Sequence, residues 1–299
     1  MRYGILLLAQ IAVGAAAIFA RFALGGAGAL GVSASRMGIA AAVLLIAGTA
    51  FRRPAASPAG GARPVRGDTL RFACAGIALA AHFALWIWSL EYTGVAVSTL
   101  LVATTPVWTA LYDAVAFKRM LSPASLGAMA LGGAGMYYVV RDSWARPPVA
   151  GHETLGALLA VAGAIAIGAY FLIVRTVRHK YGTRAIVTRT YSASAVVLIL
   201  AAALAHQAPP ALNDVRAWLG ILGMALVSQL VGHTALNAAL RWFSPSAVAF
   251  TSLLEPVAAA LLALAIFGER LGALAIVGAI ALLGAVAVFL REDLRATLP

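Results

Sequence analysis

The chain has 299 residues, of which 63% are hydrophobic and only 11% are charged, and its formal net charge is +12. A water-soluble domain needs about a quarter charged residues to cover its surface. This chain has too few, so we expect its surroundings to be lipid. The composition predicts an all-α, polytopic membrane protein rather than a water-soluble or nucleic-acid-binding protein.

Apolar runs long enough to cross a bilayer recur along the whole chain. A membrane helix needs about 20 mostly apolar residues, whereas a barrel strand needs a shorter, alternating segment. The first run is too long for the core of a signal peptide, and further runs follow at once, so we interpret it as a membrane helix. We predict ten spans, at residues 3–24, 30–50, 70–90, 94–117, 124–141, 153–174, 185–205, 215–238, 245–267 and 272–290.

The positive charges favour one side of these spans. With the N-terminus inside, 15 of the 22 Lys and Arg residues fall in inner segments, and 4 fall in outer loops. This positive-inside bias predicts a protein of the inner (plasma) membrane with both termini in the cytoplasm. It also accounts for the net charge without a nucleic-acid partner.

In the first half of the chain, polar and aromatic side chains interrupt three spans. Gln10 lies in the first span, and His82 and Trp86 share one face of the third because they are four residues apart. Trp108 and Tyr112 repeat this spacing in the fourth span. Polar groups in hydrocarbon are costly and usually face a bundle interior or a wet cavity. We therefore predict that these five residues bind a substrate.

The second half carries a longer polar stripe. Gln229, His233 and Asn237 recur every fourth residue of the eighth span, and Tyr170 lies in the sixth. On an α-helix the stripe would line one wall of the same substrate cavity. Its amides would supply donors and acceptors to the polar head of a ligand. No cluster of acids or thiols accompanies the stripe, so we predict no metal and no cofactor.

Glu255 is the only acid well inside a predicted span, and Pro256 follows it. A proline inside a helix frees a carbonyl and disfavours helix at the residue before it. Glu255 therefore has two possible roles, and both stay open. It either couples transport to protons, or it stabilises the helix break at Pro256 through hydrogen bonds. Pro106 is the matching proline of the fourth span, and we predict that both prolines are bending points for gating.

The two halves of the chain match at an offset of about 150 residues, which pairs Pro106 with Pro256. We predict two repeats, at residues 1–150 and 151–299. Each holds five spans, and this odd number inverts the second repeat relative to the first. Inverted repeats around a site at the membrane midplane are common in secondary transporters.

Two arginines occupy matched positions near span ends, Arg36 in the first half and Arg189 in the second. Long basic side chains near helix ends usually extend to the headgroups, and we expect this of both residues. Attraction of a carboxylate in the cavity is the alternative.

The segment from Ser252 to Val286 carries a family resemblance. It begins S-L-L-E-P-V, continues with G-E-R-L, and resembles the drug/metabolite transporter superfamily in its ten-helix EamA-type branch. The first half departs from the pattern, because Lys118 stands where a second Glu is expected. The resemblance implies cytoplasmic termini and export of metabolites, amino acids or drugs. The aromatic cavity is most similar to that of YddG-type aromatic amino acid exporters.

These observations predict a carrier that exports aromatic or bulky neutral amino acids by alternating access through a central cavity. The alternatives are a sugar-phosphate or nucleotide-sugar exchanger, a drug transporter, a channel and an intramembrane metal-dependent enzyme. Phosphate would require several basic residues deep in the cavity. The sequence contains neither H-E-x-x-H nor G-x-S-x-G, so we predict that the protein is not an enzyme.

Overall fold

The computed structural model describes residues 2–50, 66–93, 95–118, 121–141, 152–255, 257–258, 261–262 and 273–297. Throughout these ranges the regular structure is helical, as the composition predicts. In chain order the helices are α1 (Arg2–Gly14), α2 (Ala16–Ala23), α3 (Ala29–Ala50), α4 (Arg66–Tyr92), α5 (Val95–Val102), α6 (Thr105–Phe117), α7 (Pro123–Arg141), α8 (Glu153–Arg178), α9 (Thr183–Leu204), α10 (Val215–Gly223), η1 (Met224–His233), α11 (Thr234–Ala239), α12 (Pro245–Phe250), η2 (Thr251–Leu254) and α14 (Ala273–Thr297).

Among the described residues, six helical segments are long and apolar enough to cross a membrane. They are Arg2–Ala23, Ala29–Gly48, Arg66–Tyr92, Thr154–Arg178, Thr183–Leu204 and Val215–Ala239. These segments coincide with the first three predicted spans and with the sixth, seventh and eighth. The other four predicted spans overlap α5 with α6, α7, α12 with η2, and α14. The total of ten therefore stays a prediction.

The fourth predicted span is divided where α5 ends and α6 begins. Pro106 has no N–H to donate to the Val102 carbonyl, four residues earlier. The Thr105 hydroxyl donates to that carbonyl instead, at 2.7 Å. Pro106 therefore lies in the first turn of α6, where proline is tolerated. Pro256, its predicted partner, lies outside the described residues, and a gating role for either proline stays a prediction.

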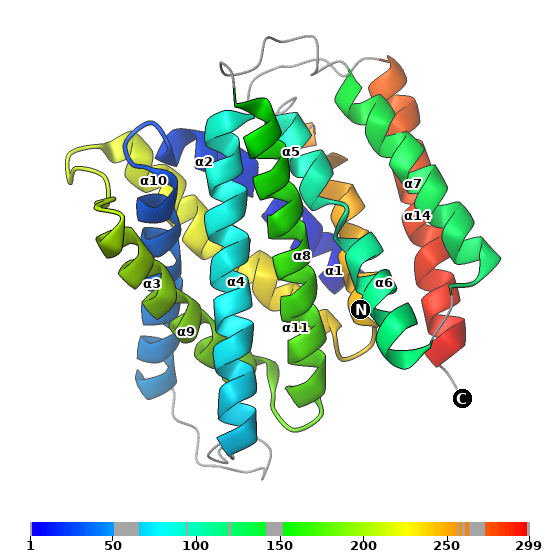
Figure 1. The fold of residues 1–299 in the computed structure, drawn as a ribbon, viewed down its shortest axis with the longest axis horizontal. Helices are drawn as coiled ribbons and strands as arrows, with labels where there is room; N and C mark the ends of the chain where they lie inside the picture. The colour runs from blue at the N-terminus through cyan, green and yellow to red at the C-terminus, as the bar shows by residue number, and fades with distance from the viewer. Residues whose placement is uncertain are drawn as a thin grey trace.

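Close packing groups the helices around the middle of the molecule. Helix α4 packs against α8 and α9, α3 packs against α9, and α1 packs against η1. Helices α7 and α14 lie side by side at one edge (Figure 1). Small residues permit the closest approaches: Ala160 and Ala164 of α8 are completely buried. This packing brings polar side chains from both halves of the chain into one interior.

An ion network joins the start of α4 to the turn between α8 and α9. Asp68 at the start of α4 is buried, and its carboxylate accepts hydrogen bonds from Arg71 at 2.7 Å and from the hydroxyl of Tyr181 at 3.1 Å. Lys180 lies 3.2 Å from the same carboxylate. Lys180 and Tyr181 belong to the turn between α8 and α9. The network therefore fastens the two halves of the chain to each other.

Gly76 marks the tightest contact between α4 and α9. A Cβ atom there would collide with the Ala193 side chain and lie 3.1 Å from both Ser194 N and Thr190 O. Gly127 of α7 has no neighbouring atom within 4 Å of such a Cβ. The two glycines therefore form a matched pair for testing the packing.

Replacing Gly76 by alanine should destabilise the protein by about 1–3 kcal/mol, because two backbone segments must move apart. Gly127→Ala should leave stability unchanged or slightly raised. Thermal unfolding of the purified proteins in one detergent measures both effects. Equal melting temperatures for Gly76→Ala and the wild type would contradict the close contact of α4 with α9.

Candidate functional site

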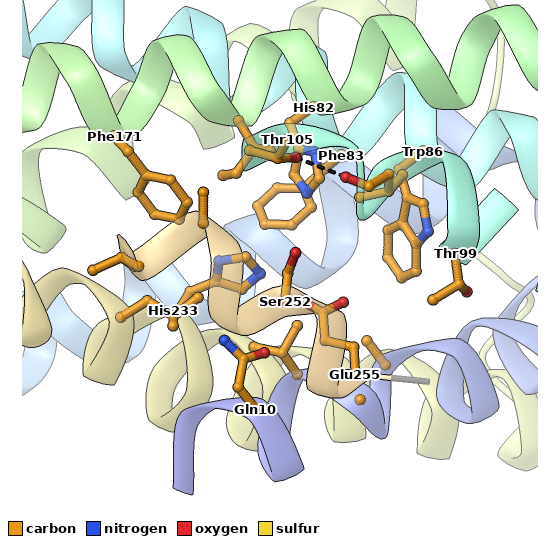
Figure 2. Close-up of a pocket in the computed structure, with 18 of the residues that line it drawn as sticks. Gln10, His82, Phe83, Trp86, Thr99, Thr105, Phe171, His233, Ser252 and Glu255 are labelled. Atoms are coloured by element: carbon orange, nitrogen blue, oxygen red, sulfur yellow. Dashed lines mark hydrogen bonds between the residues drawn. The ribbon is translucent and has the colours of Figure 1, made fainter. Parts of the chain in front are cut away.

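A pocket lies at the centre of the bundle, lined by residues of α1, α2, α4, α5, α6, α8, η1, α11, α12 and η2 (Figure 2). Five of the predicted site residues line it: Gln10, His82, Trp86, His233 and Glu255. Its cavity volume is about 50 Å³, enough for a few water molecules. Pockets that enclose drug-sized ligands measure about 300–1,000 Å³. The pocket must therefore widen to hold an amino acid.

Helix α4 contributes an aromatic wall to the pocket. His82 and Trp86, one turn apart, hold their rings nearly parallel, with centroids 6.4 Å apart and an interplanar angle of 7°. His82 Nδ1 lies 2.9 Å from the Gly163 carbonyl, an acceptor, so Nδ1 carries the proton of this hydrogen bond. The bond fixes the imidazole against α8 and orients the wall.

His233 faces this wall from η1. Its ring lies 6.3 Å from the His82 ring and 5.1 Å from the Phe83 ring, which it meets at 88°. His233 is only 5% exposed, and its Nδ1 has no hydrogen-bond partner in the described structure. Since a buried polar atom without a partner is costly, this nitrogen is available to a ligand or to water.

The remaining polar groups of the pocket come from opposite ends of the chain. Gln10 of α1 donates from Nε2 to Thr251 Oγ1 at 2.6 Å. Its buried Oε1 and the Ser252 hydroxyl have no hydrogen-bond partner among the residues that the structure describes. Glu255 follows η2, is partly exposed, and makes no hydrogen bond or ion pair to the residues described. In Figure 2 its side chain lies on the same side of the pocket as Trp86.

The three residues of the polar stripe meet different neighbours. Gln229 and His233 lie in η1, which is a π-helix, and Asn237 lies in α11. Gln229 points to α3, where its Oε1 accepts from Arg36 at 2.9 Å. His233 lines the pocket, and Asn237 contacts Tyr170 of α8.

Tyr170 and Asn237 form a buried pair away from the pocket lining. Both side chains are 0% exposed, and Tyr170 donates to Asn237 Oδ1 at 2.8 Å. Asn237 in turn donates from Nδ2 to the His233 carbonyl at 2.8 Å. These bonds join α8 to α11, immediately behind His233. A role for either residue in substrate binding remains a prediction, and the geometry gives them a structural contact.

Trp108 and Tyr112 lie outside the described lining of the pocket. Trp108 is half-buried and donates from Nε1 to Thr104 Oγ1 at 3.1 Å, in the turn just before α6. Tyr112 is 48% exposed. Spacing places both on one side of α6, but only packing decides which side faces the pocket.

Several pocket residues escape sequence reasoning. Phe83 and Phe171 line the pocket but have the same character as any apolar core residue. Thr105 and Ser252 are polar residues within predicted spans, but Ser and Thr commonly bond the backbone of their own helix, so this signal alone does not mark a site. Arg36 is 0% exposed, so the expectation that it reaches the membrane surface is wrong. Within the described ranges, no three His, Cys, Asp or Glu side chains are close enough to hold a metal ion.

The sequence profile of the EamA-like transporter family matches the chain twice, at residues 2–141 and 154–291. The chain therefore belongs to this family, as the resemblance implied, and is a multi-pass membrane protein. The family defines it as a transporter and carries no assignment of substrate.

The proteins similar to this chain include a curated relative and a solved structure. A protein of Streptantibioticus cattleyicolor described as "Probable terminal-alkyne amino-acid exporter" is 27% identical over 267 residues, which cover 86% of this chain and 82% of the relative. A solved crystal structure of another protein superposes with a TM-score of 0.75 at 18% identity, covering 98% of each chain. At this identity the crystal structure supports the fold alone.

Asn237→Ala should destabilise the protein by about 1–3 kcal/mol, because it leaves the buried Tyr170 hydroxyl with only a long contact of 3.5 Å to Thr190 Oγ1. Adding Tyr170→Phe should recover part of this loss, since the orphaned hydroxyl is then removed. Thermal unfolding of the two single variants, the double variant and the wild type measures the coupling. Strictly additive losses would contradict a direct bond between these side chains.

Proposed function

We propose that this protein exports amino acids with aromatic or bulky neutral side chains, by alternating access through the central pocket. One observation carries the proposal. The aromatic wall of His82 and Trp86 and the carboxyl group of Glu255 line the same pocket. Family membership supports transport, and the relative described as an amino-acid exporter supports the substrate class.

The pocket offers separate surfaces to the body and the head of such a substrate. Phe83, Phe171 and Trp86 present rings on which an apolar or aromatic side chain can pack. An ammonium group is attracted both to a carboxylate and to the face of an indole. We therefore assign the substrate ammonium to Glu255 and Trp86. Gln10, His233 and Ser252 have polar atoms without partners in the described structure. These atoms can form hydrogen bonds with the other polar atoms of the substrate.

Alternating access accounts for the small volume of the pocket. A cavity of about 50 Å³ matches a closed state that widens when one side opens. The predicted inverted repeats, residues 1–150 and 151–299, provide two similar halves that exchange conformations. The helix break before Pro106 is a plausible hinge, because the chain there already departs from the α-helix.

The positive-inside bias supports a location in the inner (plasma) membrane with both termini in the cytoplasm. Export then runs from the cytoplasm through the pocket to the outside. The described lining of the pocket contains no Arg or Lys. This argues against a sugar-phosphate or nucleotide-sugar substrate, whose phosphates require basic side chains at the site.

Uptake of labelled phenylalanine, threonine and methionine into proteoliposomes tests the proposal. Trp86→Ala and His233→Ala should each reduce phenylalanine transport about tenfold or more, because each removes a surface of the pocket. Trp218→Ala is the matched control, since this indole lies outside the described lining and bonds the Ala211 carbonyl, and its rate should stay within about twofold of the wild type. Wild-type vesicles that transport none of the three amino acids would refute the proposal.

Glu255→Gln should raise the KM for phenylalanine about tenfold, because it removes a charge-assisted hydrogen bond worth about 1.5–3 kcal/mol. The same vesicles, with and without a pH gradient, test the proton-coupling role of Glu255. Coupling requires that the gradient stimulate the wild type and not the Gln variant. An unchanged KM would remove Glu255 from the ammonium site.

A further inference from the structure

Arg36 of α3 is a charged side chain held entirely inside the bundle. It is 0% exposed and is the largest of the completely buried side chains in the described residues. One guanidinium nitrogen donates to Gln229 Oε1 at 2.9 Å, and the other lies 3.8 Å from the sulfur of Met224. Its guanidinium carbon lies 4.1 Å from the centre of the Phe83 ring. All three contacts are to uncharged groups.

No carboxylate of the described residues forms an ion pair with Arg36. The ion pairs in these parts of the chain join Asp68 to Arg71 and Lys180, and Glu292 to Arg295, each with at least one partner exposed. Buried arginines are almost always paired, because removing a lone cation from water costs several kcal/mol. An amide oxygen and a ring face offset only part of that cost. The site is therefore short of one negative charge.

Hydrogen-bonding capacity is also left over at this site. Arg36 Nε and Gln229 Nε2 are both buried and have no partner in the described structure. Both atoms are donors, and they belong to two side chains already bonded to each other. The missing partner is thus an acceptor that carries negative charge, which is the chemistry of a carboxylate.

The guanidinium lies one side chain behind the pocket wall. Phe83 lines the pocket, and the Arg36 guanidinium lies over its ring. The Phe83 ring also contacts the His233 ring. Gln229 lies one turn before His233 on η1. A turn of the Phe83 ring, together with the widening that any amino acid requires, would open the pocket to the Arg36 guanidinium.

We infer that Arg36 and Gln229 form the subsite for the carboxylate of the transported amino acid, with Phe83 as the barrier that turns aside. The inference rests on the proposed function and deepens it, because it makes a free carboxylate a requirement of the substrate. An amino acid amide or an amine of the same shape lacks the group that neutralises Arg36.

Competition between labelled phenylalanine and unlabelled phenylalaninamide in proteoliposomes tests this subsite. The two compounds share the ring and the ammonium group, and only the first has a carboxylate. The wild type should favour phenylalanine about tenfold or more. In Arg36→Gln the KM for phenylalanine should rise about tenfold and the preference should fall to about twofold or less. Arg36→Lys should lie between, because lysine keeps the charge and loses the planar fork.

Arg189→Gln is the matched control. Arg189 occupies the corresponding place in the second half, but it is half-buried, bonds to the Ala185 carbonyl at 3.0 Å and faces the rings of Phe72 and Tyr181. Its loss should leave the preference for phenylalanine unchanged. A merely structural Arg36 would lower expression or thermal stability in its variants without moving the preference.

Each remaining outcome decides the question. A wild type that carries phenylalanine but does not discriminate against the amide overturns the subsite and leaves amino acid export standing. Arg36→Lys with the wild-type KM and preference also overturns it, including the case in which Arg36→Gln does not fold. A wild type that transports no amino acid overturns the proposed function, and the subsite with it.

Discussion

A polar group enclosed by a helical bundle in lipid must find its partner within the protein, because the surrounding hydrocarbon offers none. Most buried side chains here obey this constraint: Asn237 bonds Tyr170, and Thr105 replaces the donor that Pro106 lacks. The exceptions include atoms of Gln10, His233 and Ser252 at the central pocket, and of Arg36 and Gln229 behind it. Five of the nine buried side-chain atoms that lack a partner within the described residues belong to these side chains, and the other four belong to Arg178, Ser192, Ser194 and Ser228.

The helices are readable from the sequence because each requires only a local property, an apolar run of about 20 residues. The spacing of polar and aromatic residues also predicted His82, Trp86 and His233 as site residues, and the structure places them together in one pocket. The division of α5 from α6 also follows from a local property. Pro106 has no N–H, so it removes a hydrogen bond from the helix that contains it.

The orientation of each side chain depends on neighbours that lie far away in sequence. Gln229 and Asn237 were expected on the same wall as His233, but packing places them against Arg36 and Tyr170. Their spacing along the helix does not show which distant side chains they meet. The position of Phe83 could not be predicted from the sequence either. Only the packing shows that its ring lies between the pocket and the buried guanidinium of Arg36.

The pocket is small, and Arg36 behind it has no ion-pair partner among the described residues. Together these features suggest one physical account of transport. A substrate that neutralises Arg36 and contacts Glu255 supplies interaction energy that the empty site lacks. Such differential binding is what shifts a protein between conformations. The ion network at Asp68 would resist this motion at one end of the bundle, since it fastens α4 to the α8–α9 turn.

The most direct measurement is an experimental structure determined with phenylalanine bound. The account predicts the amino acid in the central pocket, its ammonium group at Glu255 and Trp86, and its carboxylate within hydrogen-bonding distance of Arg36, with Phe83 displaced. Phenylalanine bound elsewhere, or bound in the pocket with its carboxylate directed away from an unmoved Arg36 and Phe83, would contradict it.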